Sequence, residues 1–283
     1  MKVFYCFPGG RFKALTMSYD DGYTEDERLV RIFNQYGIKG TFNLNSGIFE
    51  ETYRGHKRVP KERIAELYKG HEVATHGYTH ATLGRCPMIE VASEILKDRA
   101  ELEEITGGLV RGHAYPNGSY SEEIKDVFRK LGIAYGRVAS PHPDGGLKVY
   151  ALPEDPLEWR PTCHHKDPTL MERGEWLVNY KARYYLRLMY VYGHSYEFRD
   201  DDNWELIEDF CKLVGGHEDI WYATNIEIID YMEVLKSLRF SADGTRVYNP
   251  SVQSAWLTVE LDYVIEVPGG AYVDLTEALP CEE

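Results

Sequence analysis

Strand-like and helix-like segments alternate along most of this chain, and the alternation restricts the fold more than any other feature. Residues 13–19 (KALTMSY) are typical of a buried strand. Thr24 and Glu27 then form a capping-box pattern that begins a helix, and Gly37 ends it. Similar strand–helix pairs recur about seven or eight times over the first ~240 residues. Units of this length predict parallel strands whose faces are covered by helices.

This pattern predicts an α/β fold in which residues 1–239 form a distorted (β/α) barrel of about seven or eight strands. A doubly wound open sheet is the alternative, but the G-x-G-x-x-G pattern that often accompanies such a sheet does not occur. After residue 239, turn signals at Asp243-Gly244 and Asn249-Pro250 separate alternating apolar residues. We therefore expect residues 240–283 to form a small β-rich C-terminal appendage.

The net charge, the lack of long apolar runs and the cysteines indicate which partners and which cellular location to expect. The formal net charge is −14, from 32 basic and 46 acidic residues, which argues against nucleic acid or an anionic membrane as a partner. No apolar run approaches the ~20 residues of a membrane span, and the first 16 residues lack the apolar core of a signal peptide. The 5 scattered cysteines favour reduced thiols and a cytoplasmic location. An exported protein whose leader has been removed is the alternative.

Polar side chains follow several of the expected strands. Asp20 and Asp21 come after the first strand, His76 and His80 after the third, and His194 after a later apolar strand. In a βα barrel the carboxyl ends of all strands lie on one face, so these side chains are expected to meet there. Taken singly, a DDG is often only a turn and an HxxxH is often two surface histidines. Their combination at strand ends favours a functional site.

The residue types indicate metal chemistry. One carboxylate and two imidazoles make a three-ligand divalent metal site that leaves a position open for water. Such ligands suit zinc, cobalt, nickel or iron(II) better than magnesium or calcium. A second aspartate beside the site could then act as a base on the bound water.

Five short motifs resemble those of the NodB-homology polysaccharide deacetylases, the family-four carbohydrate esterases. In order, they are SYDDG at 18–22, HGYTH at 76–80, YPNG at 115–118, DPLEW at 155–159 and YGH at 192–194. The resemblance covers roughly residues 13–235. Gly77, Glu158 and Tyr192 depart from the usual residues at their positions.

The resemblance implies a role for each matching residue. Asp21, His76 and His80 would hold the metal, with zinc expected first and cobalt, nickel or iron as alternatives. Asp20 would be the general base, and His194 the general acid that protonates the leaving group. The substrate-binding residues would be Tyr115, Pro116 and Asn117, with Trp159 as a sugar platform and Glu158 as a group that tunes His194.

Two positions leave alternatives open. The family often places an arginine where this chain has Ala114, and Arg111, His113, Arg137 and Arg160 are the candidates to replace it. The run Cys163, His164 and His165 could line the cleft, form a second metal site or serve structure alone.

The predicted function is metal-dependent removal of N- or O-linked acetyl groups from a sugar or oligosaccharide. The alternatives are a hydrolase acting on a cyclic amide or ureide, and a non-catalytic sugar-binding protein. Retention of both Asp20 and His194 argues against the last, because a binding module needs neither. The sequence identifies neither the particular acetylated substrate nor the oligomeric state.

Overall fold

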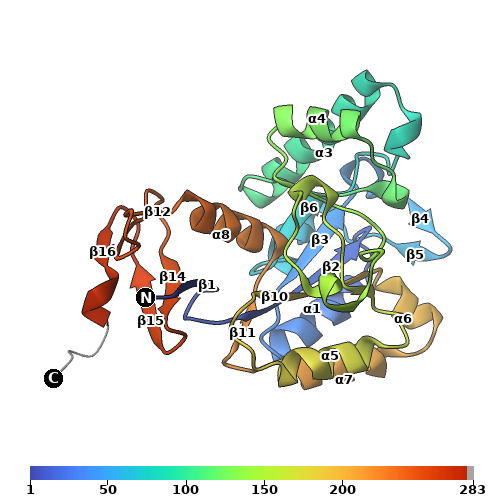
Figure 1. Ribbon diagram of the computed structural model, residues 1–283. Helices are drawn as coiled ribbons and strands as arrows, with labels where there is room; N and C mark the ends of the chain where they lie inside the picture. The colour runs from blue at the N-terminus through green and yellow to red at the C-terminus, as the bar shows by residue number, and fades with distance from the viewer. Residues whose placement is uncertain (279–283) are drawn as a thin grey trace.

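A curled parallel sheet of eight strands forms the centre of the protein, whose computed structural model describes residues 1–278 (Figure 1). The hydrogen-bonded order is β8, β7, β6, β3, β2, β10 and β9, and β11 also pairs with β2. These strands are β2 (Lys13–Asp20), β3 (Gly40–Leu44), β6 (Glu72–Thr75), β7 (Gly112–Ala114), β8 (Tyr135–Arg137), β9 (Cys163–His164), β10 (Arg187–Gly193) and β11 (Ile220–Tyr222).

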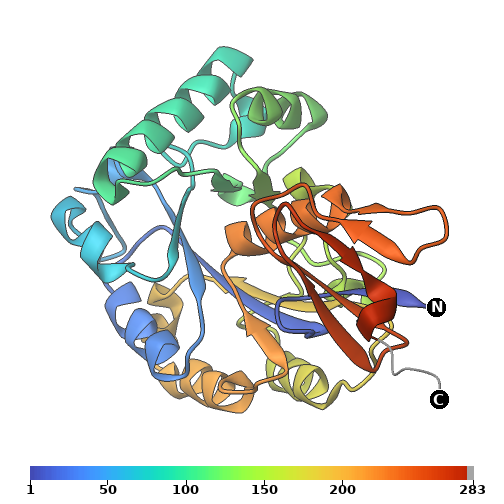
Figure 2. The same cartoon turned by 90° about the vertical axis from the view of Figure 1, so that its left-hand side faces the viewer.

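Helices surround the strands, as Figure 2 shows. They are α1 (Asp26–Gln35), α2 (Ile64–Leu67), α3 (Met88–Thr106), α4 (Glu122–Lys130), α5 (Leu170–Asn179), α6 (Tyr196–Asp200), α7 (Trp204–Val214) and α8 (Asn225–Ser237). Short 3₁₀ turns lie between them: η1 (Ser46–Ile48), η2 (Lys61–Arg63), η3 (Leu83–Arg85), η4 (Pro116–Gly118), η5 (Gly146–Tyr150) and η6 (Pro156–Glu158).

Strand β2 shows why this sequence folds with an apolar outer layer and a polar interior. Leu15, Met17 and Tyr19 are fully buried in the cluster that also contains the apolar residues of α1, α5 and α7. The alternate residues of β2 face the other side of the sheet. There the Thr16 hydroxyl donates to Asn225 of α8 at 2.8 Å. Polar groups in the interior are thus paired with one another, as burial requires.

The sheet curls far enough for its two ends to be linked by one irregular segment. A single parallel bridge joins Arg137 of β8 to Trp159, and β9, a few residues later, pairs with β10. The predicted (β/α) barrel is therefore confirmed. It is distorted because β9 is only two residues long and most of the chain from 138 to 162 is not strand.

Three local predictions were wrong. The apolar run at residues 148–152 (KVYAL) predicts a short strand, but its first three residues lie in η5. Thr24 does not cap α1, because Glu25 occupies the N-cap position and provides no side-chain cap. The sequence predicts Asn225 as the cap of the last helix, but Thr224 caps α8, with Glu227 completing the capping box, and the side chain of Asn225 points into the barrel interior.

The β-rich region after the barrel takes in the N-terminus of the chain. Strand β1 (Val3–Cys6) pairs with β14 (Ala255–Val259), which pairs with β15 (Tyr263–Val267). A second small sheet contains β12 (Arg239–Phe240), β13 (Arg246–Tyr248) and β16 (Tyr272–Asp274), and η7 (Leu275–Ala278) follows it. A two-stranded hairpin, β4 (Thr52–Tyr53) and β5 (His56–Lys57), completes the strands. The division at residue 239 stays a prediction, but β1 belongs with the appendage rather than with the barrel.

The four cysteines within residues 1–278 are free thiols, and Cys281 lies outside the described residues. Over the same range, the helices are all too short or too polar to cross a membrane.

Candidate active site

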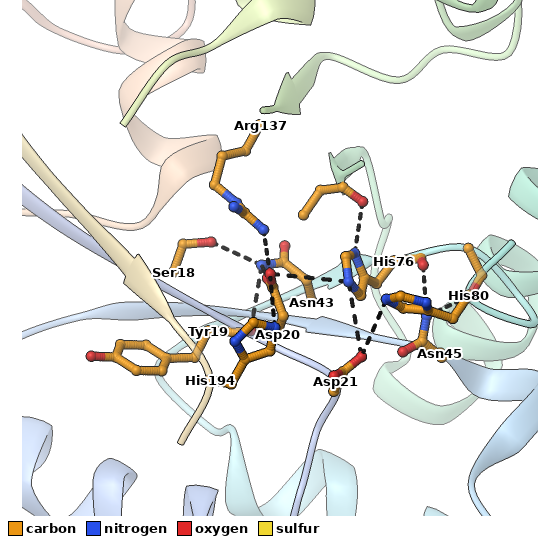
Figure 3. Close-up of polar contacts among 12 residues, drawn as sticks. Ser18, Tyr19, Asp20, Asp21, Asn43, Asn45, His76, His80, Arg137 and His194 are labelled. Atoms are coloured by element: carbon orange, nitrogen blue, oxygen red, sulfur yellow. Dashed lines mark hydrogen bonds and ion pairs between the residues drawn. The ribbon is translucent and has the colours of Figure 1, made fainter. Parts of the chain in front are cut away.

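The two adjacent aspartates stand at the end of β2 and point in different directions (Figure 3). Asp20 is the last strand residue and is buried. Asp21 adopts a left-handed conformation with φ of 78°, which L-residues rarely adopt. This turn sends the Asp21 carboxylate toward His76 and His80, whereas Asp20 faces Arg137 and His194. Like charges are thus separated by the backbone, and strained backbone of this kind is typical of functional sites.

Asp21, His76 and His80 form a group with the geometry of a three-ligand metal site. Oδ1 of Asp21 lies 3.9 Å from Nε2 of His76 and 3.8 Å from Nε2 of His80. One ion with bonds of about 2 Å can therefore reach all three atoms. The same Asp21 oxygen is buried and has no hydrogen-bond partner among the described residues. A bound cation would satisfy such a buried carboxylate oxygen.

The protonation state of His76 also fits ligation. Its Nδ1 lies 2.8 Å from the carbonyl oxygen of Ala114, which can only accept, so Nδ1 carries the proton. The Nε2 lone pair is then left free toward Asp21. Burial lowers the pKa of His76 to about 4, although Asp20 and Asp21 oppose the shift, so the ring is neutral near pH 7.

Buried polar groups hold the metal-ligand loops in place. Oδ2 of Asp98 accepts the backbone N–H of His76 at 3.0 Å, and its Oδ1 accepts the N–H of Ser46 at 2.8 Å. The Asn45 amide donates to the carbonyl oxygens of His76 and Gly77 at 2.6 and 2.7 Å. The two loops that follow β3 and β6 are therefore tied together beneath the site.

Asp20 is paired with a buried arginine, Arg137. Nη2 of Arg137 lies 2.5 Å from Oδ2 of Asp20, and the Asn43 amide donates to Oδ1 at 2.8 Å. Burial alone would raise the pKa of Asp20, but Arg137, His76, His194 and the Asn43 hydrogen bond hold it well below its usual range. Asp20 is therefore a carboxylate, the form that can accept a proton. The four candidates to replace an arginine at the Ala114 position are Arg111, His113, Arg137 and Arg160. Of these, Arg137 is the one that contacts Asp20.

His194 lies near Asp20 in the same cleft and contacts Glu197, a residue that the sequence did not single out. Its Nδ1 is 3.2 Å from Oε2 of Glu197, and its Nε2 is 4.0 Å from Oδ2 of Asp20. Burial favours the neutral ring, but the Glu197 hydrogen bond and the charges of Asp20 and Asp21 outweigh it and raise the pKa of His194 above its ordinary value.

Glu158 does not take the position expected for it. Its carboxylate contacts Lys125 at 3.3 Å and Arg160 at 2.8 Å, and no contact with His194 occurs among residues 1–278. Glu158 lies on η6, in the loop after β8, and not beside His194.

A cleft of about 600 Å³ surrounds these groups. Its wall is lined by Asp20, Asp21, Tyr23, Ile48, Glu51, Thr52, Tyr53, Arg58, His76, Thr79, His80, Tyr115, Asn117, Gly118, Arg137, Ala139, Tyr192, His194 and Tyr196. Tyr115 and Asn117 thus lie where predicted, and Asn117 has a left-handed φ of 55°. Pro116 is buried and does not line the cleft.

Trp159 is not a sugar platform. Its side chain is 1% exposed and packs edge-on against Tyr135 and Tyr190 in the barrel interior. Pairing of Trp159 with the end of β8 turns the ring inward, where an apolar ring is stabilised by burial. The aromatic rings that do line the cleft are tyrosines, among them Tyr53 and Tyr196.

Sequence reasoning missed Glu197, Asn43 and Asp98. Glu197 follows His194 at a spacing of three residues, which places two side chains on one face at the start of a helix. The sequence could therefore have predicted the contact between them. Asn43 near the end of β3 is a second polar residue at a strand end. Asp98 lies in the middle of α3, and no local pattern distinguishes it from a surface acid.

The comparisons with known proteins point to one family. Residues 9–136 match the family model described as polysaccharide deacetylase. A chitin deacetylase of Arthroderma benhamiae is 28% identical over 125 residues, which are 42% of this chain and 31% of that protein. The match thus spans about a third of the length of that curated relative.

One of the similar solved structures shows the same fold. A candidate polysaccharide deacetylase from Mycobacterium smegmatis has a TM-score of 0.58 at 16% identity, covering 81% of this chain and 93% of the other. A family-four carbohydrate esterase pseudoenzyme from Bacillus anthracis has a TM-score of 0.47 at 15% identity, covering 80% of this chain and 68% of the other.

Proposed function

We propose that the chain is a metal-dependent hydrolase of the polysaccharide deacetylase family, whose model residues 9–136 match. The substrate is a sugar or oligosaccharide that carries N- or O-linked acetyl groups. The observation that carries the proposal is that Asp20 lies beside the Asp21–His76–His80 group, with His194 next to Asp20, all at the ends of parallel strands.

Asp21, His76 and His80 would hold the metal ion, and their mixed oxygen and nitrogen donors suit zinc, cobalt, nickel or iron(II). A divalent ion bound there supplies a Lewis acid, which polarises an acyl carbonyl and lowers the pKa of water.

The side chains of this protein would carry the proton transfers. Asp20, held as a carboxylate by Arg137, accepts a proton from water as the water oxygen bonds to the acyl carbon. The bond from that carbon to the sugar nitrogen or oxygen then breaks. His194 donates the proton on its Nε2 to the leaving atom, so that acetate and the free amine or alcohol are the products. The backbone N–H of Asn117, a residue of the cleft wall, would donate to the oxygen that gains negative charge.

Acetate release tests this proposal. Protein stripped of metal is given zinc, cobalt or nickel and incubated with a panel of N- and O-acetylated sugars, and we expect release to depend on added metal. Asp20→Asn keeps the shape of the side chain but cannot accept the proton, so kcat should fall by about 10²- to 10⁴-fold while substrate still binds.

The two other functions give different results. A hydrolase of cyclic amides would bind metal stoichiometrically, release no acetate from the panel and open cyclic amides or ureides. A non-catalytic sugar-binding protein would bind the sugars equally well with and without the Asp20→Asn change and would turn over none of them.

A further inference from the structure

A second cluster of potential metal ligands lies beside the site. His164 of β9, His165 and Glu197 of α6 offer ligand atoms that all lie within 4.8 Å of one another. Oε2 of Glu197 is at the centre of the cluster, 3.3 Å from Nε2 of His164 and 3.4 Å from Nε2 of His165. By distance alone, this group is as good a metal site as the first.

Hydrogen bonding at His164 argues against a metal there. The backbone N–H of Lys166 donates to Nδ1 of His164 at 3.1 Å, so Nδ1 must present its lone pair. A neutral imidazole then carries its proton on Nε2, the atom that faces Glu197. A protonated nitrogen donates a hydrogen bond and cannot bind a metal ion. His76 shows the opposite arrangement, because its Nδ1 donates to a carbonyl oxygen and its Nε2 is free.

Two other neighbours of Glu197, His194 and Lys166, also present a donor or a cation to it. The backbone N–H and Nδ1 of His194 lie 3.1 and 3.2 Å from Oε2. The ammonium group of Lys166 lies 3.2 Å from Oε1. Although burial opposes ionisation, the hydrogen bonds from His164 and His194 hold the pKa of Glu197 well below its usual range. Glu197 is thus a carboxylate that accepts hydrogen bonds, with its charge already partly compensated by a cation.

We propose that Glu197, itself fixed by His164, is the positioning residue for His194, and that the cluster is not a second metal site. Because a carboxylate only accepts hydrogen bonds, Glu197 keeps the proton of His194 on Nδ1. When His194 loses its other proton to the leaving group, the remaining neutral form is the one that Glu197 stabilises. This inference rests on the proposed function, since it gives His194 the role of the acid.

Glu197 acts on His194 together with groups from several elements. Asp20 at the end of β2 faces Nε2, the charge of Asp21 lies beyond it, and the His164 ring lies 6.3 Å away between centroids. The ring of Tyr196 packs at 5.2 Å. Asp20 is paired with Arg137, and the charge of Asp21 would be offset by a bound ion. Glu197 therefore remains the main group that favours protonated His194 in the loaded enzyme.

Glu197→Gln tests the proposal, because glutamine has the same shape without the charge. Loss of an adjacent opposite charge should lower the pKa of His194, so the basic limb of the kcat/KM profile should move to lower pH by about one to two units. Glu197→Asp keeps the negative charge, so the basic limb should move by less in this variant than in Glu197→Gln. Glu158→Gln is the matched control, since it removes a carboxylate from the neighbouring loop that does not contact His194, and its basic limb should stay at the wild-type pH.

Two readouts do not depend on turnover. Nitrogen-15 NMR of the histidine rings should show a proton on Nδ1 of His194, and its titration should move to lower pH in Glu197→Gln. Metal analysis should find one zinc per chain, in wild type and in His164→Ala alike.

The outcomes separate this inference from the proposed function. Turnover with an unshifted basic limb in Glu197→Gln would overturn the inference and leave the function standing. Two zinc ions per chain, falling to one in His164→Ala, would also overturn it. If none of the acetylated sugars is turned over, the proposed function is contradicted. The NMR titration then still shows whether Glu197 raises the pKa of His194.

Discussion

At the scale of single residues, the Arg137–Asp20 pair shows how a buried charge is made tolerable. Arg137 is 1% exposed, and its guanidinium also lies over the Tyr192 ring at 4.7 Å. Removing one member of a buried ion pair leaves the other charge uncompensated, which typically costs about 3–5 kcal/mol.

Arg137→Met should therefore weaken both stability and activity. We expect the free energy of unfolding in urea to fall by about 3–5 kcal/mol. We also expect kcat to fall about 10- to 100-fold, less than the ~10²–10⁴-fold that a positioned base supplies, because Asp20 is displaced but still present. Arg160→Met is the control, since its ion pair with Glu158 is partly exposed and should contribute at most about 1 kcal/mol. Equal losses in both variants would contradict this account of Asp20.

At the scale of elements, one buried carboxyl joins two helices. Asp26 of α1 accepts a hydrogen bond from the hydroxyl of Tyr68, which ends α2, at 2.7 Å. Burial outweighs this contact and raises the pKa of Asp26 to about 7. The folded protein therefore binds a proton at pH values where the unfolded chain, with an ordinary aspartate, has lost it.

This difference in proton binding makes stability fall as pH rises from about 4 to about 7. Asp26→Asn keeps the shape and cannot ionise, so the variant should match wild type near pH 4. It should be the more stable protein at pH 8, by a few kcal/mol on the scale of about 1.4 kcal/mol for each unit of pKa. Urea unfolding at several pH values measures this. Asp209→Asn, at an exposed position of α7, should shift stability equally at all pH values, and the same behaviour in Asp26→Asn would refute the buried-carboxyl account.

At the scale of the whole molecule, the metal-ligand group joins distant parts of the chain. Asp21 follows β2, whereas His76 and His80 follow β6, and β3 lies between these strands in the sheet. An ion that binds only the folded arrangement stabilises the whole barrel, by about 2.7 kcal/mol at a concentration 100 times its Kd.

The melting temperature should therefore rise with zinc concentration in wild type and not in His80→Ala. His80 is partly exposed, so its truncation should change the metal-free protein little. His142→Ala removes a partly exposed histidine outside the site and should retain the full zinc effect. A zinc effect that survives His80→Ala would show that the ion binds elsewhere.

The barrel and the polar residues at the ends of its strands could be predicted from the sequence. Alternating strand and helix patterns require parallel strands, and parallel strands bring their carboxyl ends to one edge. Asp20, Asp21, His76, His80 and His194 could be placed on one face for this reason, before any contact was known.

Only the tertiary structure decided which side chains support these residues. Arg137 and Glu197 reach Asp20 and His194 from other elements, while Trp159 turns into the core and Glu158 turns away. Such outcomes depend on how far the sheet curls and on the path of the irregular chain between β8 and β10. Sequence periodicity describes neither, because it specifies the face on which a residue lies and not the distant neighbour that it meets.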